Sequence, residues 1–190
     1  PIDVTKPVEA DHFDVEPKGL LAAMAETHPG MEHNSPTTFG GMFFHFFNGG
    51  IRLVGMYKAG MHVRQVRGDF PEYRNFILPS EACRHVMSLF KDTVSAQIRA
   101  TENSFTMQSD RAWYRSKLVE GEFMPYRKII EMDRPNSATV DPVGLLASIN
   151  RACAIRDDGK GHRLKCVVSD GSIHISMRNM DGEESADECR

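Results

Sequence analysis

Two ten-residue stretches of this sequence are near copies of one another: VEPKGLLAAM (Val15–Met24) and VDPVGLLASI (Val140–Ile149). Six of the ten positions are identical, and three others exchange close relatives such as Glu and Asp. The two copies lie 125 positions apart in a chain of 190 residues. A repeated stretch of this kind predicts a fold built from repeating units.

A third, fainter copy lies halfway between the first two. The stretch FILPSEACRHVMSLF (Phe76–Phe90) places Pro79 62 residues after Pro17 and 63 residues before Pro142. The sequence therefore predicts a unit of about 62 residues that occurs three times in tandem.

Each copy has the same local pattern of a short apolar strand, a proline and a helical stretch. Proline suits the first helical turn, because it lacks only an amide hydrogen that has no partner there. It also favours extended backbone in the residue before it, which is acidic in the outer copies (Glu16 and Asp141) and suits the positive helix terminus. The apolar spacing then predicts one buried stripe on each helix: Leu20, Leu21 and Met24; Val86, Leu89 and Phe90; Leu145, Leu146 and Ile149.

Strand signals follow each helix. In the first copy, two apolar runs flank Asn48-Gly49-Gly50, which is a strong hairpin signal. The second copy has strands broken at residues 102–103 and 109–110, and the third has a strand pair around residues 170–171. The predicted fold class is therefore α+β, with tandem repeats of a strand, a helix and further strands.

The ends of the repeats differ in their strand signals. Runs at residues 61–66 and 112–119 predict one further strand in the first two copies only. The acidic run DGEESADE at residues 181–188 is interpreted as solvated loop charge.

Composition narrows the function classes. Hydrophobic residues make up 41% and charged residues 26% of the chain, as in ordinary globular proteins. No apolar run approaches the roughly 20 residues of a membrane span, and the acidic, proline-containing start does not resemble a signal peptide, so we expect a cytoplasmic protein. The net charge of −3 argues against a protein that coats nucleic acid with its whole surface, but it allows a local basic patch.

The cysteines and histidines do not suggest a metal site or another cofactor site. The four cysteines are widely separated and are interpreted as small core residues, with Cys189 in the tail. The eight histidines lack the spacing of metal ligands. His45 and His174 alternate with apolar residues, which is typical of outward-facing strand positions.

Three stretches resemble the bacterial DNA polymerase sliding clamp family, the beta subunit of the replicative polymerase. They are SKLVEGEFMPYRKII (Ser116–Ile130), FGGMFF (Phe39–Phe44) and VDPVGLLASINRACAI (Val140–Ile155). The resemblance implies a DNA-clamp fold in which two repeats build each domain, with antiparallel sheets outside and helices inside. In that family three domains form a crescent, and two crescents close into a ring around duplex DNA.

The resemblance also implies a domain division. Residues 1–11 would be a tail, residues 12–133 a middle clamp domain with repeats at about 12–74 and 75–133, and residues 134–190 an incomplete third domain with one repeat. Family members are about twice as long. A fragment of a longer clamp and a naturally short relative both remain open.

The implied function is that of a non-catalytic accessory subunit of a DNA-directed DNA polymerase. A ring holds DNA topologically, so its contacts with the phosphates must be electrostatic and independent of sequence. The expected partners are double-stranded DNA, the polymerase and clamp-loader subunits that dock through short linear motifs, and further copies of the chain in a homo-oligomer.

Two sets of residues follow from the resemblance. The DNA-facing basic set is Lys18, Arg84, His85, Lys91, Arg151, Arg156, Lys160 and His162. The peptide pocket is expected at Phe39, Gly60, Met61, His62, Val63, Met124, Lys128 and Ile129. The pocket lacks several polar members of the family pattern, and Met124 stands where the family has proline.

Two other function classes remain open. A short clamp-like protein could bind a clamp, or clamp-binding peptides, as a regulator without encircling DNA. An enzyme is the least supported class, because the sequence contains no nucleophile elbow, no phosphate-binding glycine loop and no paired carboxylates with clear acid–base spacing.

Overall fold

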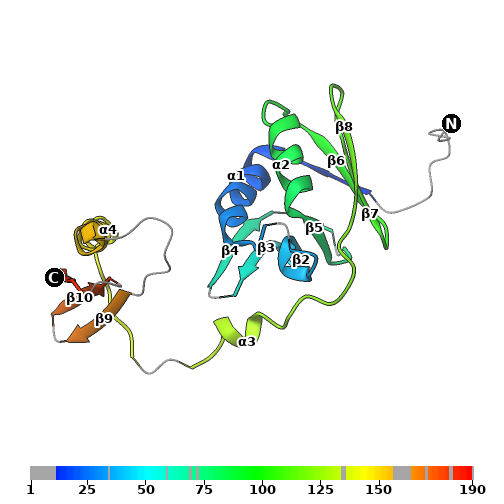
Figure 1. Ribbon diagram of the computed structural model, residues 1–190. Helices are drawn as coiled ribbons and strands as arrows, with labels where there is room; N and C mark the ends of the chain where they lie inside the picture. Colours follow the sequence, from blue (N-terminus) through cyan, green and yellow to red (C-terminus); the bar gives the residue numbers. More distant parts are fainter. Residues whose placement is uncertain are drawn as a thin grey trace. The chain divides into compact units, whose positions relative to one another are not determined.

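The computed structural model of the protein describes residues 12–33, 35–58, 60–68, 70–71, 73–133, 136–155, 164–169, 171–179 and 182–189. The chain divides into two compact units, Pro1–Ile130 and Glu131–Arg190 (Figure 1). Helices and antiparallel sheets occur in both units, so the predicted α+β class is confirmed.

The first unit contains two repeats with the same order of elements. The first repeat consists of β1 (His12–Val15), α1 (Pro17–Thr27), β2 (Gly41–Phe47), β3 (Gly50–Tyr57) and β4 (Gly60–Arg67), with short 3-10 turns at η1 (His28–Gly30) and η2 (Thr38–Gly40). The second repeat consists of β5 (Phe76–Pro79), α2 (Ser80–Leu89), β6 (Ala96–Ala100), β7 (Ser104–Gln108) and β8 (Trp113–Lys117), and the short helix α3 (Arg127–Ile130) follows it.

The strands after each helix form antiparallel hairpins at the predicted places. Strands β2 and β3 pair around Asn48-Gly49, and Gly49 has a φ of 92°, a left-handed conformation that favours glycine. Strands β6 and β7 pair across residues 102–103, and β8 adds to β7. The hairpin predictions for these two repeats are confirmed.

The two repeats of the first unit exchange their first strands. One sheet has the order β4-β3-β2-β5, so a strand of the second repeat completes the sheet of the first. The other has the order β1-β6-β7-β8, in which Val15 pairs with Ala96 and Phe13 with Ile98. Each repeat therefore depends on the other for its fourth strand.

Helices α1 and α2 contact each other and pack on the two sheets (Figure 1). Leu20, Leu21 and Met24 of α1 are buried, as the repeat pattern predicts. Gly55 of β3 lets the end of α1 approach closely, because a Cβ atom there would lie 2.6 Å from the carbonyl oxygen of Thr27. The side chains buried most completely in this unit include Phe44, Phe90, Phe105, Leu53, Leu78 and Ile98.

The helix starts agree with the prediction in the outer copies and differ in the middle one. Pro17 and Pro142 begin their helices, and Glu16 and Asp141 before them are extended. Asp141 also caps its helix, since its carboxylate accepts hydrogen bonds from the amides of Val143 (3.2 Å) and Gly144 (2.8 Å), whereas Glu16 makes no such bond.

In the middle copy the helix begins one residue later than predicted. Pro79 is still part of strand β5, where it lies opposite Gly41, and α2 begins at Ser80. The ladder with β2 holds the backbone of Pro79 extended, with a ψ of 146°.

The second unit contains one repeat. It consists of helix α4 (Pro142–Ala152), a 3-10 turn at η3 (Cys153–Ile155) and the strands β9 (Leu164–Ser169), β10 (Ser172–Arg178) and β11 (Glu184–Cys189). The strands form a sheet with the order β11-β10-β9, and α4 packs on β10 and β11. The predicted strand pair around residues 170–171 is confirmed.

Strand β11 corrects the prediction of a loop in the acidic run. Its side chains alternate between exposed positions and positions that face the helix, ending at buried Cys189. Ser185 lies opposite Met177 and Asp187 opposite Ile175. The alternation was hidden in the sequence, because small and acidic residues occupy positions that are usually apolar.

The predicted helix stripes are only partly buried. Leu89 and Leu146 are exposed, whereas Val86 and Phe90 are buried. Leu145 and Ile149 are half-buried. On α4 the reason is structural, since no second helix of the same unit lies against it among the described residues, as α2 does against α1.

The cysteine prediction is correct for Cys83, which is buried, and wrong for Cys166, which is exposed on β9. The tail residue Cys189 is buried in β11. Within the described part of the chain, no group of three or more His, Cys, Asp or Glu side chains is placed to hold a metal ion. None of the described helices combines the length and the apolar character needed to cross a membrane.

Candidate nucleic-acid and peptide interfaces

Four members of the predicted basic set lie on or beside the helices of the first unit. Lys18 is exposed on α1, Arg84 and His85 are exposed on α2, and Lys91 is exposed just after α2. His85 Nδ1 lies 3.2 Å from the hydroxyl of Tyr114, and Lys91 forms a long ion pair of 4.0 Å with Asp92. Among the described residues, Lys18 and Arg84 have no ion-pair partner.

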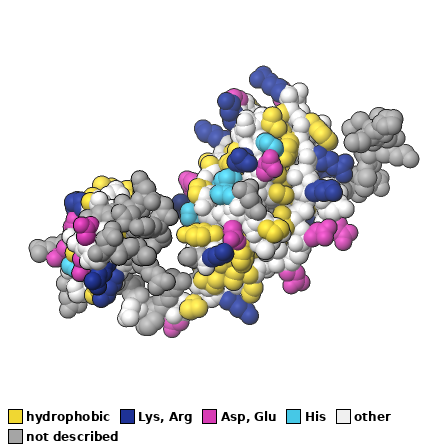
Figure 2. Space-filling view, in the orientation of Figure 1, with side chains coloured by type: hydrophobic (Ala, Val, Ile, Leu, Met, Phe, Trp, Pro, Cys, Tyr) yellow, Lys and Arg dark blue, Asp and Glu magenta, His cyan; other side chains and the backbone are white. Residues whose placement is uncertain are grey.

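The helix side is therefore only modestly basic. Figure 2 shows lysine and arginine side chains spread over the visible face and interspersed with acidic ones. Exposed cations also occur on the outer sheet face, at Arg67 on β4 and Lys117 on β8. Such a distribution allows weak electrostatic contact with phosphates rather than a strong nonspecific coat.

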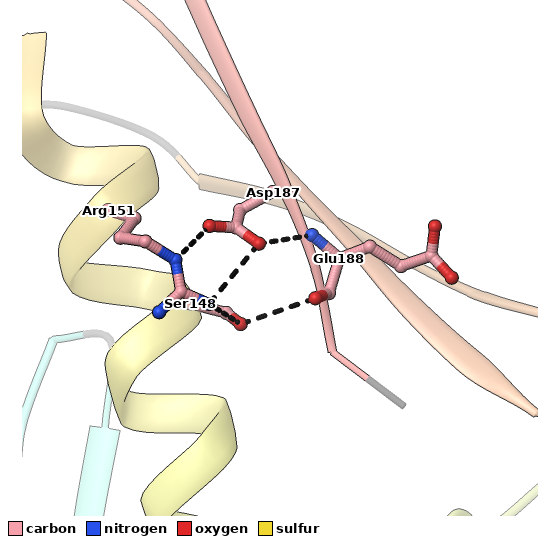
Figure 3. A network of polar contacts seen from close by, with 4 residues as sticks. All are labelled: Ser148, Arg151, Asp187 and Glu188. Atoms are coloured by element: carbon pink, nitrogen blue, oxygen red, sulfur yellow. Dashed lines mark hydrogen bonds and ion pairs between the residues drawn. The ribbon is translucent and has the colours of Figure 1, made fainter.

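Arg151, predicted to contact DNA, is instead engaged within the second unit (Figure 3). Its guanidinium pairs with Asp187 on β11, and its Nη2 donates to Ser148 Oγ over 3.0 Å. Asp187 Oδ1 also accepts from the backbone amide of Glu188 over 2.6 Å, and Ser148 Oγ donates to the carbonyl of Glu188 over 3.5 Å. The network ties α4 to β11.

The charges of this pair stabilise one another. The hydrogen bond with Asp187 raises the pKa of Arg151, and the same bond lowers the pKa of the Asp187 carboxyl. Because the Arg151 charge already has a partner, its predicted contact with DNA has less support than those of Lys18 and Arg84. Sequence patterns did not indicate the pair, because its members lie 36 positions apart and one of them was assigned to a loop.

The remaining members of the basic set are Arg156, Lys160 and His162. They lie outside the described residues.

Four members of the predicted peptide pocket begin strand β4. Gly60 lies opposite Tyr57, Met61 opposite Met56, and Val63 opposite Val54. A hollow of about 280 Å³ lies beside this hairpin and is lined by Pro29, Met31, Glu32, Tyr57, Lys58 and His62. Only His62 of the predicted pocket lines this hollow, whose other lining residues the sequence did not indicate.

Backbone hydrogen bonds connect Phe39 to the same hairpin. The amide of Glu32 donates to the carbonyl oxygen of Phe39 (3.0 Å) and to that of Met56 (3.1 Å). Since Met56 lies opposite Met61, the structure brings Phe39 and the start of β4 to neighbouring positions through Glu32.

One further pocket member, Phe39, joins an aromatic group on the outer face of β2. The ring of Phe39 meets Phe123 edge-on with centroids 6.5 Å apart, and Phe123 stacks on Phe43 at 4.7 Å. The hydroxyl of buried Tyr126 lies 2.5 Å from His45 Nδ1. Met124 and Ile129 are half-buried close to these rings in sequence, and Lys128 is exposed.

Sequence reasoning missed Phe43, His45, Phe123 and Tyr126. The available signal was the alternation in β2, which places Phe43 and His45 on the face opposite the buried Phe44. His45 was interpreted as a surface residue, but it is half-buried. Burial, with smaller contributions from Arg52 and Arg127, lowers the pKa of His45 and favours its neutral form.

A second hollow was also not indicated by the sequence. It has a volume of about 850 Å³ and lies beside Phe43, Ile77 and Val119. Its lining includes the carboxylates of Glu102, Glu120 and Glu122 and one cation, Arg74. This acidic lining does not suit phosphate groups.

One serine contacts two histidines at the start of α2. Ser80 Oγ lies 2.7 Å from His33 Nδ1 and 3.2 Å from His28 Nε2. The Ser80 carbonyl oxygen is also 3.2 Å from His28 Nε2, and Ser80 is buried. Burial, together with the nearby His33 and Arg84, lowers the pKa of His28. These bonds hold the segment after α1 against the start of α2.

No family model matches the chain. The chain is 26% identical over 105 residues to the beta sliding clamps of two Caulobacter vibrioides strains, NA1000 / CB15N and CB 15. The match covers 55% of this chain and 27% of those proteins.

Solved structures of sliding clamps match nearly the whole chain in fold. The DNA polymerase sliding clamp from Pseudomonas aeruginosa gives a TM-score of 0.84 at 16% identity, covering 100% of this chain and 53% of that one. The clamp from Caulobacter crescentus gives 0.84 at 17% identity, covering 99% and 53%. The chain thus spans about half the length of these solved chains. Its fold is that of the bacterial DNA polymerase III beta sliding clamps.

Proposed function

We propose that this chain forms part of a DNA sliding clamp, a ring that holds a polymerase on duplex DNA without performing chemistry. One observation carries the proposal. The two repeats of the first unit exchange their first strands around a shared core, within a chain whose fold matches solved clamps almost from end to end. A cytoplasmic location, with the replication machinery, belongs to the same proposal.

In this proposal the first unit corresponds to a complete clamp domain and the second to one repeat of the next domain. The helices face the DNA, Lys18, Arg84 and Lys91 supply the positive charge, and His85 lies beside Arg84 on α2. Because Lys18 and Arg84 are exposed and lack ion-pair partners among the described residues, they can contact phosphates without first breaking another interaction. Few cations on a protein of net charge −3 suit contacts that are weak enough to slide.

A ring is tested by the topology of its DNA. Complexes of the protein with a nicked circular plasmid are separated from free protein by gel filtration, and the plasmid is then cut at one site. Because a ring falls off free ends, we expect at least about tenfold more protein on the circle than on the linear form. Equal retention on both forms would contradict encirclement, and peptide binding without such retention would favour the regulator.

We further propose that the first unit docks peptides of replication partners. The docking surface consists of the start of β4, Phe39 and the residues around α3. Its exposed and half-buried apolar side chains suit a linear motif that carries leucine and phenylalanine. Loss of the polar members of the family pattern is expected to make the binding weak.

Val63→Asp is expected to weaken peptide binding at least tenfold, because it places a charge on a half-buried apolar position of the surface. A fluorescein-labelled pentapeptide that carries leucine and phenylalanine serves as the probe in an anisotropy titration. Val94→Asp is the matched control, because Val94 is 84% exposed between α2 and β6 and belongs to none of the segments that form this surface. Equal affinities for both variants would count against this surface.

A further inference from the structure

The outer face of the sheet β1-β6-β7-β8 carries a group of side chains that neither candidate interface includes (Figure 1). The inner face of this sheet belongs to the core, as buried Ile98 and Met107 show. Side chains alternate along a strand, so the residues before and after these two point outward. Directly opposed residues of neighbouring strands share a face. The registers therefore place two rows of side chains on the outer face: Arg99, Thr106 and Arg115, and beside them Gln97, Gln108 and Trp113.

Trp113 is the exposed aromatic residue of this face. It is 54% exposed on the edge strand β8, and it lies opposite Gln108. The outward positions next to it, Gln108 and Arg115, are polar or charged, so the indole does not belong to an apolar patch of the sheet face. A flat aromatic ring that stays open to solvent offers a surface on which a nucleotide base can stack.

Two cations share the face with this indole. Arg99 and Arg115 lie in one row on either side of Thr106, two strand spacings or roughly 10 Å apart. Among the described residues, neither arginine has an ion-pair partner. Arg115 Nη2 donates to Ser104 Oγ over 3.4 Å, which leaves other N–H groups of the guanidinium for a ligand.

The carboxylates near these cations lie at the margins of the face. Asp14 of β1 accepts a hydrogen bond from Gln97 Nε2 over 3.4 Å, and Asp110 in the turn between β7 and β8 pairs with the next residue, an arginine, over 3.5 Å. A third cation, Lys117, ends β8 next to Leu118, which lines the acidic hollow described above. The positive charge of the face is therefore concentrated at the two arginines.

We propose that the surface formed by Arg99, Thr106, Gln108, Trp113 and Arg115, here called the Trp113 face, binds single-stranded DNA. The indole stacks on a base, and the two guanidinium groups contact phosphates of the same strand. Such contacts need no particular sequence, because every base has a face that can stack. The choice of DNA as the polymer rests on the proposed clamp function, whereas the stacking and the charge follow from this face alone.

The same features argue against two other occupants. A duplex keeps its bases stacked on one another, so it offers phosphates to the arginines but nothing to the indole. An acidic peptide would pair with the arginines, but its apolar side chains would meet polar neighbours around Trp113. Because the helices pack on the inner side of the sheets, a single strand on the Trp113 face and a duplex against the helices would not compete.

Trp113 reports on the proposal directly, because it is the only tryptophan of the chain. An oligothymidylate of about 15 nucleotides, within the site sizes of known single-strand binders, should quench the tryptophan emission of the 190-residue chain as it binds. A duplex of the same length should leave the emission nearly unchanged. Absence of binding would overturn the proposal, and so would binding, followed by the anisotropy of a labelled oligothymidylate, without quenching.

Trp113→Ala should weaken oligothymidylate binding at least about fivefold, the lower end of the effect of one stacked base, and Trp113→Phe should keep most of the affinity. Tyr57→Ala is the matched control, because Tyr57 is 42% exposed at the end of β3 in the other sheet. Circular dichroism checks that the variants fold. Equal affinities of the two alanine variants would remove the indole from the binding surface and overturn the proposal.

Arg99→Glu/Arg115→Glu should reduce the magnitude of the slope of log K against log salt concentration by about 1.4, since each phosphate neutralised on a single strand contributes about 0.7. Lys18→Glu/Arg84→Glu lowers the net charge equally on the helix side and should keep the slope for oligothymidylate. Equal changes in both variants would overturn the proposal, because the strand would then respond to net charge alone. Polyglutamate that competes as well as unlabelled oligothymidylate would overturn it in favour of an acidic peptide. None of these measurements needs a closed ring, so their failure is distinct from failure of the comparison between circular and linear DNA.

Discussion

Phe44→Ala is expected to lower the free energy of unfolding of the first unit by about 3–5 kcal/mol. Phe44 is 1% exposed, and its ring stacks on Phe76 with centroids 4.6 Å apart. Truncation removes the apolar contacts and leaves a cavity between sheet and helices that the packed core cannot refill. Since whole domains are stable by about 5–15 kcal/mol, this loss brings the unit close to spontaneous unfolding.

The matched control is Phe47→Ala in the same strand. Phe47 is three positions after Phe44, so its side chain is on the other face of the strand. There it is half-buried on the outer sheet face, and Arg52 lies 4.8 Å from its ring centroid. Its truncation should therefore cost clearly less than that of Phe44. Urea unfolding followed by circular dichroism measures both variants. Equal losses would mean that the helix-facing side of β2 is not the principal core of the unit.

The alternation of β2 side chains between the core face and the outer face also shows how much of the fold could be predicted. The alternation of apolar residues, the glycine turn and the proline at the helix start are local signals. They placed the hairpins of the first unit and the start of α1 correctly, and the start of α2 to within one residue. Strand β11 could not be predicted in this way. Its inward positions carry Ser185 and Asp187 in place of apolar residues, and Asp187 pairs there with Arg151 of α4, a contact that no local pattern indicates.

The same limit applies to the burial of α4. Near-identical stretches predict near-identical helices, and both helices do form at the expected residues. Burial, however, depends on what lies against the helix, and that belongs to another repeat. Leu21 and Leu146 therefore differ in exposure although their local sequences are almost the same.

For the candidate interfaces, the sequence located individual residues better than their partners. Phe39 and the start of β4 are brought close together, but through the backbone of Glu32, which carries no chemical signal in the sequence. The aromatic contacts of Phe123 and Tyr126 join segments about 80 residues apart in the chain, as the His45–Tyr126 separation of 81 positions shows. Contacts over such separations are set by the tertiary fold rather than by local spacing.

The double variant Lys18→Glu/Arg84→Glu is expected to weaken duplex DNA binding at least tenfold near 100 mM salt. If each cation neutralises one phosphate, its loss reduces the magnitude of the negative slope of log K against log salt concentration by about 0.9, so loss of the pair reduces it by about 1.8. Reversal adds repulsion, which acts in the same direction. Fluorescence anisotropy with a labelled 30-base-pair duplex, titrated at several salt concentrations, measures the affinity and the slope together.

The decisive control changes the same total charge on the other side of the unit. Arg67→Glu/Lys117→Glu reverses two exposed cations on the outer sheet face, so the net charge falls equally. If DNA lies against the helices, this control keeps the slope of the original protein, because the Debye length at 0.1 M salt is only about 10 Å and distant charges are screened. A slope whose magnitude falls equally in both variants would mean that DNA responds to net charge alone. An unchanged slope in the helix variant would remove Lys18 and Arg84 from the interface, and with them the physical basis for placing DNA on the helix side of this fold.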